Sequence, residues 1–226
     1  MSKCITLLSG GMDSATLLAL ALQRHEQVMA LSIDYAQRHK IELQSAKAIA
    51  KHFQIHHEIL DITNINHLLA GSSLTSDIAI PHGHYEDESM KQTVVPARNT
   101  ILLSIAAGWA ISQGFDIVAY AAHAGDHAIY PDCRPDFVLA MQQVFNVFDY
   151  NPMQLWTPFL ELDKAAILRV GIPLGVPYDK TWTCYDPQRE FKRDQWLACG
   201  SCGSCGERRE AFAKIGIKDP VQYLEN

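Results

Sequence analysis

The sequence has no apolar run long enough to cross a membrane, no excess of basic residues and no internal repeat. Its longest apolar stretch, residues 101–111, is interrupted by Ser104 and falls well short of the roughly 20 residues of a membrane-spanning helix. The 19 basic and 25 acidic residues give a formal net charge of -6, which argues against charge-driven binding to nucleic acid or to an anionic membrane. We therefore expect neither a direct nucleic-acid partner nor a membrane.

The chain also lacks a continuous secretory signal and the length for two ordinary domains. Gly10, Gly11 and Asp13 interrupt the apolar N-terminal stretch where a signal peptide would be continuous, so we expect a cytoplasmic protein. With 226 residues, of which 48% are hydrophobic, the chain can bury one sizeable core. We predict a single domain over residues 1–226, made of a core over 1–170 and a C-terminal segment, rich in Gly, Pro and Cys, over 171–226.

What is present is an alternation of short β-rich apolar runs with longer helical patterns, which predicts an α/β fold with a doubly wound, mostly parallel sheet. The predicted strands span residues 5–8, 28–33, 56–62, 116–121 and 153–156. The predicted helices span residues 14–23, 40–53, 99–113 and 136–148. Residues 63–93 break this rhythm, and an irregular segment of that length is typical of a functional loop. We predict that it forms a lid.

A glycine-rich hexapeptide, SGGMDS, stands between the first predicted strand and helix. Its glycines permit a tight turn, and the free amides of a helix N-terminus hold anions. The hexapeptide lacks the Lys-Ser/Thr ending of GxxxxGK[ST] and the third glycine of a dinucleotide fingerprint. It resembles the pyrophosphate loop of the PP-loop family, with an ordinary capped βα turn as the alternative. The predicted nucleotide-binding residues are Leu8, Ser9, Gly10, Gly11, Met12, Asp13, Ser14, Ala15 and Thr16.

Four of the six cysteines crowd the last fifth of the chain, which in a reducing compartment suggests a metal. Cys199, Cys202 and Cys205 form two overlapping CxxC hooks, and Cys184 completes a possible tetrahedral thiolate site. A fourth cysteine followed by proline, as in the ferredoxin run, is missing after Cys205. Structural zinc is therefore favoured, and an iron–sulfur cluster remains the competitor.

Two further polar patterns follow predicted strands. Asn99 is predicted to be a helix N-cap, with Arg98 on a loop near the carboxyl edge of the sheet. The loop after residue 121 gathers Asp126, Asp132 and Arg134, and could hold a planar polar ligand, with Arg134 pairing bidentately with a carboxylate. A plain helix start and a polar turn are the alternative interpretations.

The motifs together resemble one family. SGGMDSAT, YAQRH, SSLT, VPARN, YPDCRPDF, TPFLELDKAAI, TWTCY and CGSCGSC are similar, in order and over nearly the whole chain, to the 7-cyano-7-deazaguanine synthase family of queuosine biosynthesis. The resemblance implies an adenine nucleotide alpha hydrolase-like (PP-loop) fold. Ala36 and Ala97 stand where the family usually has glycine, and the gap from Cys184 to Cys199 is longer than its usual spacing. Alanine at a position of positive φ would be strained.

The resemblance implies an ATP-dependent carbon–nitrogen ligase. ATP would activate the carboxylate of 7-carboxy-7-deazaguanine, ammonia would form the amide, and a second ATP would drive dehydration to the nitrile. The cofactors would be one structural zinc per chain and Mg²⁺ with the ATP, and a homodimer fits the family. The implied catalytic residues are Ser9, Asp13 and Lys164, and the implied substrate residues are Arg98, Asn99, Asp126, Asp132 and Arg134.

Two other functions remain open at the level of sequence. A PP-loop tRNA-modifying enzyme of the thiolase type would use the cysteines to carry sulfur or a cluster. The net charge of -6 and the lack of a basic run count against it. A non-enzymatic ATP-sensing module with a zinc knuckle is the second alternative, and multiple-turnover nucleotide hydrolysis would separate it from an enzyme.

Overall fold

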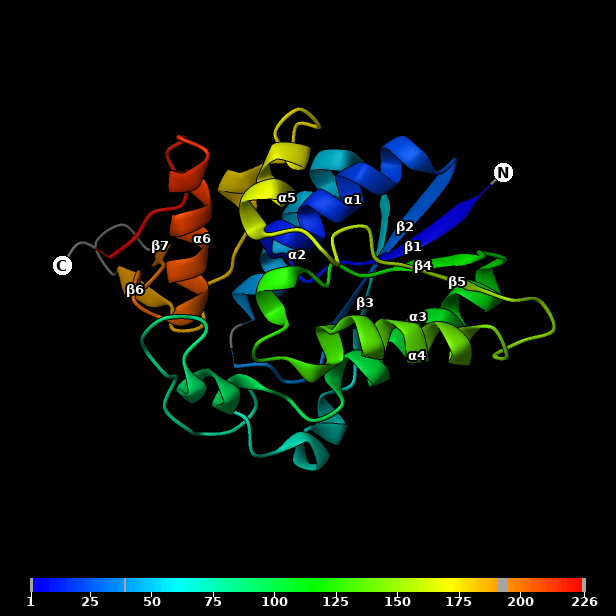
Figure 1. Cartoon of the computed structure of the whole chain (residues 1–226), viewed down its shortest axis with the longest axis horizontal. Helices are drawn as coiled ribbons and strands as arrows, with labels where there is room; N and C mark the ends of the chain where they lie inside the picture. The colour runs from blue at the N-terminus through cyan, green and yellow to red at the C-terminus, as the bar shows by residue number, and fades with distance from the viewer. Residues whose placement is uncertain (1, 39, 191–194, 225–226) are drawn as a thin grey trace.

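A five-stranded parallel sheet forms the centre of the molecule (Figure 1). The computed structural model describes residues 2–38, 40–190 and 195–224; His39, which the sequence predicts to be a structural residue, lies outside them. The strand order is β3-β2-β1-β4-β5, and every neighbouring pair is parallel. The strands are β1 (Lys3–Leu7), β2 (Gln27–Asp34), β3 (His56–Asp61), β4 (Ile117–Ala119) and β5 (Gln154–Trp156). The predicted strands and the α/β fold class are confirmed.

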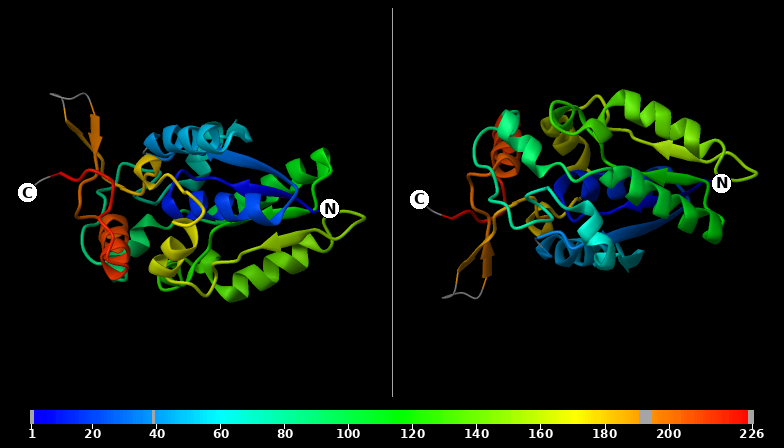
Figure 2. Two further views of the ribbon diagram at one scale, coloured as in Figure 1. Left: turned by 90° about the horizontal axis from the view of Figure 1, so that it is seen from above. Right: turned by 90° about the horizontal axis from the view of Figure 1, so that it is seen from below.

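Helices cover both faces of this sheet, as a doubly wound fold requires. One face carries α1, α2 and α5, and the other carries α3 and α4 (Figures 1 and 2). The helices are α1 (Met12–Arg24), α2 (Ile41–Phe53), α3 (Arg98–Gln113), α4 (Pro135–Phe145), α5 (Lys164–Gly171) and α6 (Gly203–Lys214). In the part of the chain that is described, no helix combines the length and the apolar character needed to cross a membrane.

Alternation along the strands explains why both faces are buried. In β1, Cys4 packs on the side of α1 and α5, whereas the next residue, Ile5, packs against α3 and α4. The neighbouring strand β4 repeats this with Ile117 and Val118. Because successive side chains of a strand point to opposite faces, a sheet covered on both sides needs continuous apolar runs. Such runs made the strands predictable.

Several elements were not predicted from the sequence. Residues 63–93 contain two 3-10 helices, η1 (Thr63–Leu69) and η2 (Glu88–Thr93), and bury Leu69, Leu74 and Met90; whether the segment moves as a lid stays a prediction. Beyond residue 171 the chain forms the hairpin β6 (Gln188–Glu190) and β7 (Gln195–Leu197) and the helix α6. The hairpin and α6 lie at the end of the molecule away from the N-terminus (Figure 2).

The strand order places a binding site at one edge of the sheet. The chain winds from β1 towards β3 on one side and from β4 to β5 on the other, so the order reverses between the neighbours β1 and β4. Loops that leave the carboxyl ends of strands on either side of such a switch point splay apart and leave a crevice. The SGGMDS loop follows β1, and the loop that begins with His123 follows β4.

Candidate active site

The glycine-rich loop after β1 is braced into a fixed turn. Ser14 Oγ accepts a hydrogen bond from the Ser9 N–H (3.2 Å) and donates one to the Gly11 carbonyl (3.1 Å). Gly10 has φ +92, and a Cβ there would lie 2.1 Å from the Glu42 carbonyl oxygen. Only glycine therefore fits where the loop crosses the start of α2. The Gly10 carbonyl in turn accepts the Trp182 N–H at 2.9 Å, which ties the loop to the C-terminal segment.

Eight of the nine predicted nucleotide-binding residues divide into two groups, and the ninth is Gly10, whose contact with α2 is described above. Members that line a cavity of about 260 Å³ are Leu8, Ser9, Gly11, Asp13 and Ser14. The remaining side chains face the interior: Met12, Ala15 and Thr16 are fully buried. Thr16 Oγ1 bonds the Met12 carbonyl and lies 2.8 Å from the Tyr178 hydroxyl. These three residues support the loop and do not line the cavity wall.

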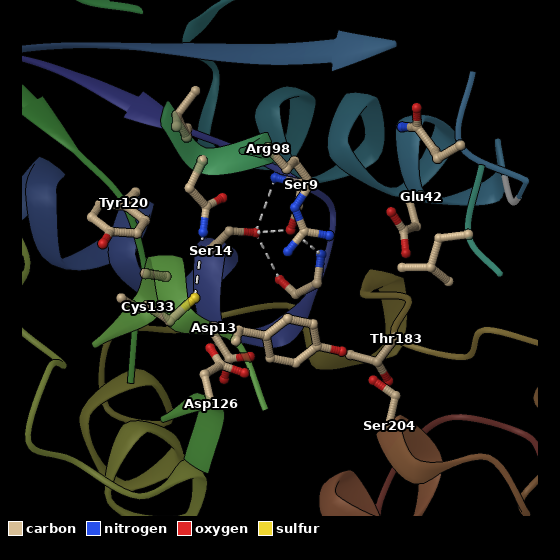
Figure 3. A pocket seen from close by; sticks show the side chains of 18 of the residues that line it. Ser9, Asp13, Ser14, Glu42, Arg98, Tyr120, Asp126, Cys133, Thr183 and Ser204 are labelled. Atoms are coloured by element: carbon tan, nitrogen blue, oxygen red, sulfur yellow. Dashed lines mark hydrogen bonds between the residues drawn. The ribbon is translucent and has the colours of Figure 1, made fainter. Parts of the chain in front are cut away.

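A cluster of charged side chains occupies the cavity beside this loop. The buried Lys164 Nζ lies 3.4 Å from Asp13 Oδ2 and pairs with Glu207 Oε2 at 2.5 Å. His123 is 2% exposed, and its Nε2 lies 3.4 Å from Asp126 Oδ2 and 3.7 Å from Asp13 Oδ2. The His123 Nδ1 accepts the Gly125 N–H, so the ring presents its Nε2 proton to the two carboxylates. Asp13 and Asp126 lie side by side in Figure 3.

The electrostatics of the cluster favour a charged lysine among crowded carboxylates. Burial alone would lower the pKa of Lys164, but Asp13, Glu207 and Asp126 outweigh it and raise the pKa. Burial raises the pKa of Asp126, against the attraction of His123 and Lys164. Asp13 Oδ1 is buried without a hydrogen-bond partner among the described residues. A buried carboxylate oxygen without a partner fits a cation held together with phosphate oxygens.

Only part of the predicted substrate set faces the cavity. Arg98, Asn99 and Asp126 line it, whereas Asp132 and Arg134 are not among the lining residues. Asp132 Oδ2 accepts the Asn99 N–H at 2.9 Å. The Arg134 Nε donates to the His127 carbonyl at 2.7 Å. Asp132 and Arg134 therefore hold the loop after β4 in place, and Arg134 is not paired with a carboxylate in the described structure.

The start of α3 also differs from the prediction. Arg98 is the first residue of the helix and not a loop residue, and the N-cap position belongs to Ala97 and not to Asn99. Asn99 is buried, and its Nδ2 donates to the Asp132 carbonyl at 3.1 Å. Ala36 and Ala97 have φ values of 62 and 50. Both therefore take the left-handed conformation that favours glycine, as the sequence comparison suggested.

Among the cavity residues that sequence reasoning did not single out, three are titratable groups next to the predicted site: His123, Glu207 and Glu42. His123 had a signal, because it follows β4 at the carboxyl edge of the sheet. Glu207 had none nearby, since it reaches Lys164 from the second turn of α6, far along the chain. Glu42 lies in the first turn of α2, near the aromatic residues Tyr35 and Trp182 in the cavity wall. Burial raises its pKa to about 7, against the pull of Arg98.

The four predicted metal-binding cysteines converge. Cys184, Cys199, Cys202 and Cys205 are buried, and their sulfur atoms all lie within 4.8 Å of one another. Cys199 Sγ and Cys205 Sγ are 3.9 Å apart. Backbone N–H groups point at the sulfurs, including those of Cys199 to Cys184 Sγ (3.2 Å) and Cys202 to Cys199 Sγ (3.3 Å). Such donors stabilise thiolates, so the cluster is built for a cation.

The cysteine cluster is linked directly to the cavity. Cys202 is the N-cap of α6 and Cys205 lies in its first turn, so the same helix carries Gly203, Ser204 and Glu207 into the cavity wall. On the other side, Cys184 follows Trp182 and Thr183, which also line the cavity. The Trp182 Nε1–H donates to the Cys184 carbonyl at 3.1 Å. The cluster thus fixes both segments that close the cavity.

Comparison with known proteins agrees with this geometry. The chain matches the family described as queuosine biosynthesis protein QueC over residues 3–216. It is 51% identical over 221 residues to 7-cyano-7-deazaguanine synthase 1 of Colwellia psychrerythraea, covering 98% of each chain. It is 51% identical over 219 residues to the 7-cyano-7-deazaguanine synthase of Alteromonas mediterranea, covering 97% of each.

Comparison with solved structures shows proteins of a similar fold. The NMN synthetase of Francisella tularensis superposes with a TM-score of 0.50 at 14% identity, covering 100% of this chain and 89% of that one. At that identity the likeness concerns the fold alone. The match to the family spans nearly the whole chain, and the predicted phosphate loop and cysteine cluster lie within it. This chain belongs to the queuosine biosynthesis protein QueC family.

Proposed function

We propose that this protein is a 7-cyano-7-deazaguanine synthase, which converts 7-carboxy-7-deazaguanine and ammonia to the nitrile at the expense of ATP. One observation carries the proposal: the SGGMDS loop, which includes Asp13, opens into the same cavity as Lys164 and Arg98. An anion cradle and cationic side chains then face one small-molecule site. Relatives with this name, about half identical over nearly their full length, support the assignment.

The chemistry is activation of a carbonyl oxygen. A carboxylate oxygen is a poor leaving group, and transfer of a nucleotidyl group from ATP makes it a good one, with release of pyrophosphate. Ammonia then displaces the nucleotide and forms the amide. A second ATP activates the amide oxygen, and loss of the two nitrogen protons with that oxygen gives the nitrile. Each activation needs groups that stabilise negative charge on the departing phosphates.

The residues of the chain divide this work between them. The free backbone amides at the N-terminus of α1 would hold phosphate oxygens, while the Ser9 and Gly11 amides brace the loop. Lys164 is kept charged by its carboxylate neighbours and neutralises phosphate charge. Arg98 lines the same cavity as Ser9, where it would hold the substrate carboxylate during attack. Mg²⁺ would be held by Asp13, whose Oδ1 lacks a protein partner, and would neutralise charge on the phosphates.

The cysteine cluster is proposed to hold one structural zinc. With Zn–S bonds of about 2.3 Å, the edge of a tetrahedron is about 3.8 Å. The 3.9 Å between Cys199 Sγ and Cys205 Sγ fits that edge. Four protein ligands leave no position for substrate, so the metal would act on folding and on placement of α6. Elemental analysis should give about one zinc per chain; a brown protein with several irons would instead support the thiolase alternative.

A direct assay tests the function. Wild-type protein is incubated with ATP, ¹⁵N-ammonium and 7-carboxy-7-deazaguanine, and the products are followed by mass spectrometry. We expect a nitrile that carries ¹⁵N, with AMP or another hydrolysed nucleotide over many turnovers. Without ATP neither amide nor nitrile should form. Nucleotide binding without turnover would favour the sensor alternative, and light scattering separately tests the homodimer that the resemblance implies.

Two loop variants test the site assignment. Asp13→Asn and Ser9→Ala are expected to lower turnover by about 100-fold or more, since each removes a group facing the phosphates. Circular dichroism should stay that of the wild type, because neither side chain belongs to the apolar core. Wild-type turnover in both variants would remove the loop from the mechanism.

A further inference from the structure

The cavity has two chemically different ends on either side of the phosphate loop. One end is formed by side chains at the carboxyl ends of the strands and on α3, mostly apolar: Leu7, Leu31, Ile33, Leu102 and Tyr120. The other end carries Glu42 with Tyr35, Trp182, Thr183 and Tyr185. Figure 3 shows Tyr120 and Cys133 on one side of Ser9 and Ser14, and Glu42 with Thr183 on the other. Two ring-shaped ligands must share the cavity under the proposed function.

Glu42 is the acidic group of its end of the cavity. Four acidic residues are described in the cavity wall, and the other three, Asp13, Asp126 and Glu207, belong to the cluster around Lys164. The Glu42 carboxylate makes no hydrogen bond and no ion pair within the described residues, although it faces the cavity. Gln37, its polar neighbour, is occupied: its side chain accepts the Tyr35 N–H at 3.0 Å. Glu42 is therefore free to receive donors from a ligand.

The acidity of this end decides which ligand it suits. Phosphates are repelled by the Glu42 carboxylate when it is ionised, so we expect the triphosphate to extend away from Glu42. An adenine edge presents one exocyclic amine beside ring acceptors, which would face the carboxylate unfavourably. A guanine-like edge presents a ring N–H next to a 2-amino group, two adjacent donors that match the two oxygens of one carboxylate. Carboxylates that accept such a pair form strong charge-assisted bonds.

The walls of this end suit a flat ring. Tyr35 and Trp182 are both less than 10% exposed and pack in one cluster with Leu74, and Tyr185 packs against that cluster. Trp182 is held by its hydrogen bonds to Gly10 and Cys184. Arg98 lines the same cavity, close enough to Glu42 for its charge to oppose the rise in the pKa of Glu42. A ring held at Glu42 would thus direct its opposite side towards Arg98 and the phosphate loop, where the carboxylate must react.

From this arrangement we propose that Glu42 is the specificity residue for the deazapurine, accepting its ring N–H and 2-amino hydrogens. The proposal rests on the proposed function for the identity of the ligand. The adenosine of ATP would then occupy the other end of the cavity, the mostly apolar end formed by the carboxyl ends of the strands and by α3. It leaves the chemistry to the loop, Lys164 and Arg98, so Glu42 selects and orients the substrate and transfers no proton.

The test compares two ligands in two variants. In the wild type, the KM for 7-carboxy-7-deazaguanine should be about 10–100-fold lower than for the analogue without the 2-amino group. In Glu42→Gln the KM for the full substrate should rise by about 10–100-fold, the preference between the two should nearly vanish, and the KM for ATP should change less than about twofold. Glu26→Gln, at the opposite edge of the sheet, is the matched control and should behave as wild type.

Binding measurements separate this inference from the proposed function. Calorimetry with 7-deazaguanine, which has no carboxylate to activate, should show weaker binding to Glu42→Gln and to Glu42→Asp than to the wild type. Unchanged binding and unchanged preference would overturn the inference even if the wild type makes nitrile. A rise in the KM for ATP alone would also overturn it, because Glu42 would then face the nucleotide. A wild type that makes no nitrile would refute the proposed function, while the binding result still decides the role of Glu42.

Discussion

Residues 1–170 and the segment beyond them are held together by different forces. In the N-terminal region, α3 alone buries Leu103, Ala106, Ala107 and Ala110 against the sheet. In the C-terminal region, α6 is polar along most of its length, and its largest fully buried side chain is Arg208. The first region is stabilised mainly by apolar area removed from water. The second depends on cysteines and on buried hydrogen bonds.

Arg208 shows how the polar region is fixed. Its Nε and Nη2 donate to the two oxygens of Asp219 at 2.8 and 3.0 Å, its Nη1 donates to Thr181 Oγ1, and its Nη2 also bonds the Tyr178 carbonyl. Phe212, one turn further, packs with α1, α2 and α5. A single buried guanidinium thus joins α6, the residues before Trp182 and the C-terminal loop. The stability of this region depends on a few side chains, so single substitutions should lower it strongly.

Loss of the cysteine site should have the largest effect. Cys205→Ser removes one of four thiolates, so metal content should fall and α6 should loosen, since a structural metal couples its ligands to folding. Turnover should fall about 100-fold or more because Glu207 and Ser204 leave the cavity wall. Hydrogen exchange should show fast exchange in α6 and continued protection in β1 and β4. Cys4→Ala, in the sheet, is the control and should keep its metal; equal exchange changes in both regions would contradict the comparison.

Arg208→Ala comes next. It leaves the largely buried Asp219 carboxylate without its partner, and breaking such a pair costs about 3–5 kcal/mol of unfolding free energy. Arg209→Ala is the matched control, because Arg209 is exposed, donates to the Gly200 carbonyl and lies over the Tyr223 ring; we expect its replacement to cost less than about 1 kcal/mol. Denaturant unfolding of the metal-loaded proteins measures both. Similar losses of unfolding free energy in the two variants would mean that the buried pair of Arg208 and Asp219 contributes no more to stability than an exposed arginine.

A pH series tests Glu42, at the border of the two regions. Its pKa is raised to about 7 in the folded protein; between about pH 4.5 and 7 the folded state therefore binds more protons than the unfolded state. The contribution of Glu42 to the unfolding free energy of the wild type therefore falls as the pH rises through that window. Glu42→Gln should gain about 1–3 kcal/mol relative to wild type between pH 5 and 8. A difference that stays flat across pH, as expected for Glu26→Gln, would show that Glu42 ionises freely.

The smallest effect concerns two alanines in the N-terminal region. Ala36 and Ala97 are left-handed, with φ values of 62 and 50. Replacing either by glycine relieves that strain and should stabilise the protein by about 0.5–1 kcal/mol. Ala48→Gly in the interior of α2 should instead cost about 1 kcal/mol. Thermal unfolding of the three variants gives the signs; a loss in all three would show that the two loops are not strained.

The same contrast explains what the sequence could predict. The strands and the four longer predicted helices carry apolar residues at regular spacing, so periodicity located them within a few residues. α6 has no apolar stripe, because Cys205 and Arg208 occupy its buried face. α5 is only eight residues long. Neither helix could be found from hydrophobic pattern, since the groups that stabilise them find partners far away in the chain.

The candidate site was likewise predictable only where its residues form a local pattern in the sequence. The phosphate loop and the cysteines were recognisable because each is a local run of residues with a defined chemistry. Glu207 and Glu42 gain their place in the cavity from the packing of α6 and α2, which no local pattern records. Asp132 and Arg134 bond backbone groups of the protein, and their role as substrate residues stays a prediction. Composition of a loop does not say which of its side chains turn outwards.

The contact between Gly10 and the first turn of α2 has a consequence for how this enzyme could acquire new substrates. The carbonyl of Glu42 fills the space that a Cβ of residue 10 would need. Any remodelling that shifts the backbone at the start of α2 therefore disturbs the phosphate loop at the same time. Diversification of the substrate pocket, by natural drift or in the laboratory, should proceed through exchanges of side chains on a preserved backbone, with insertions and deletions near residue 42 eliminated early.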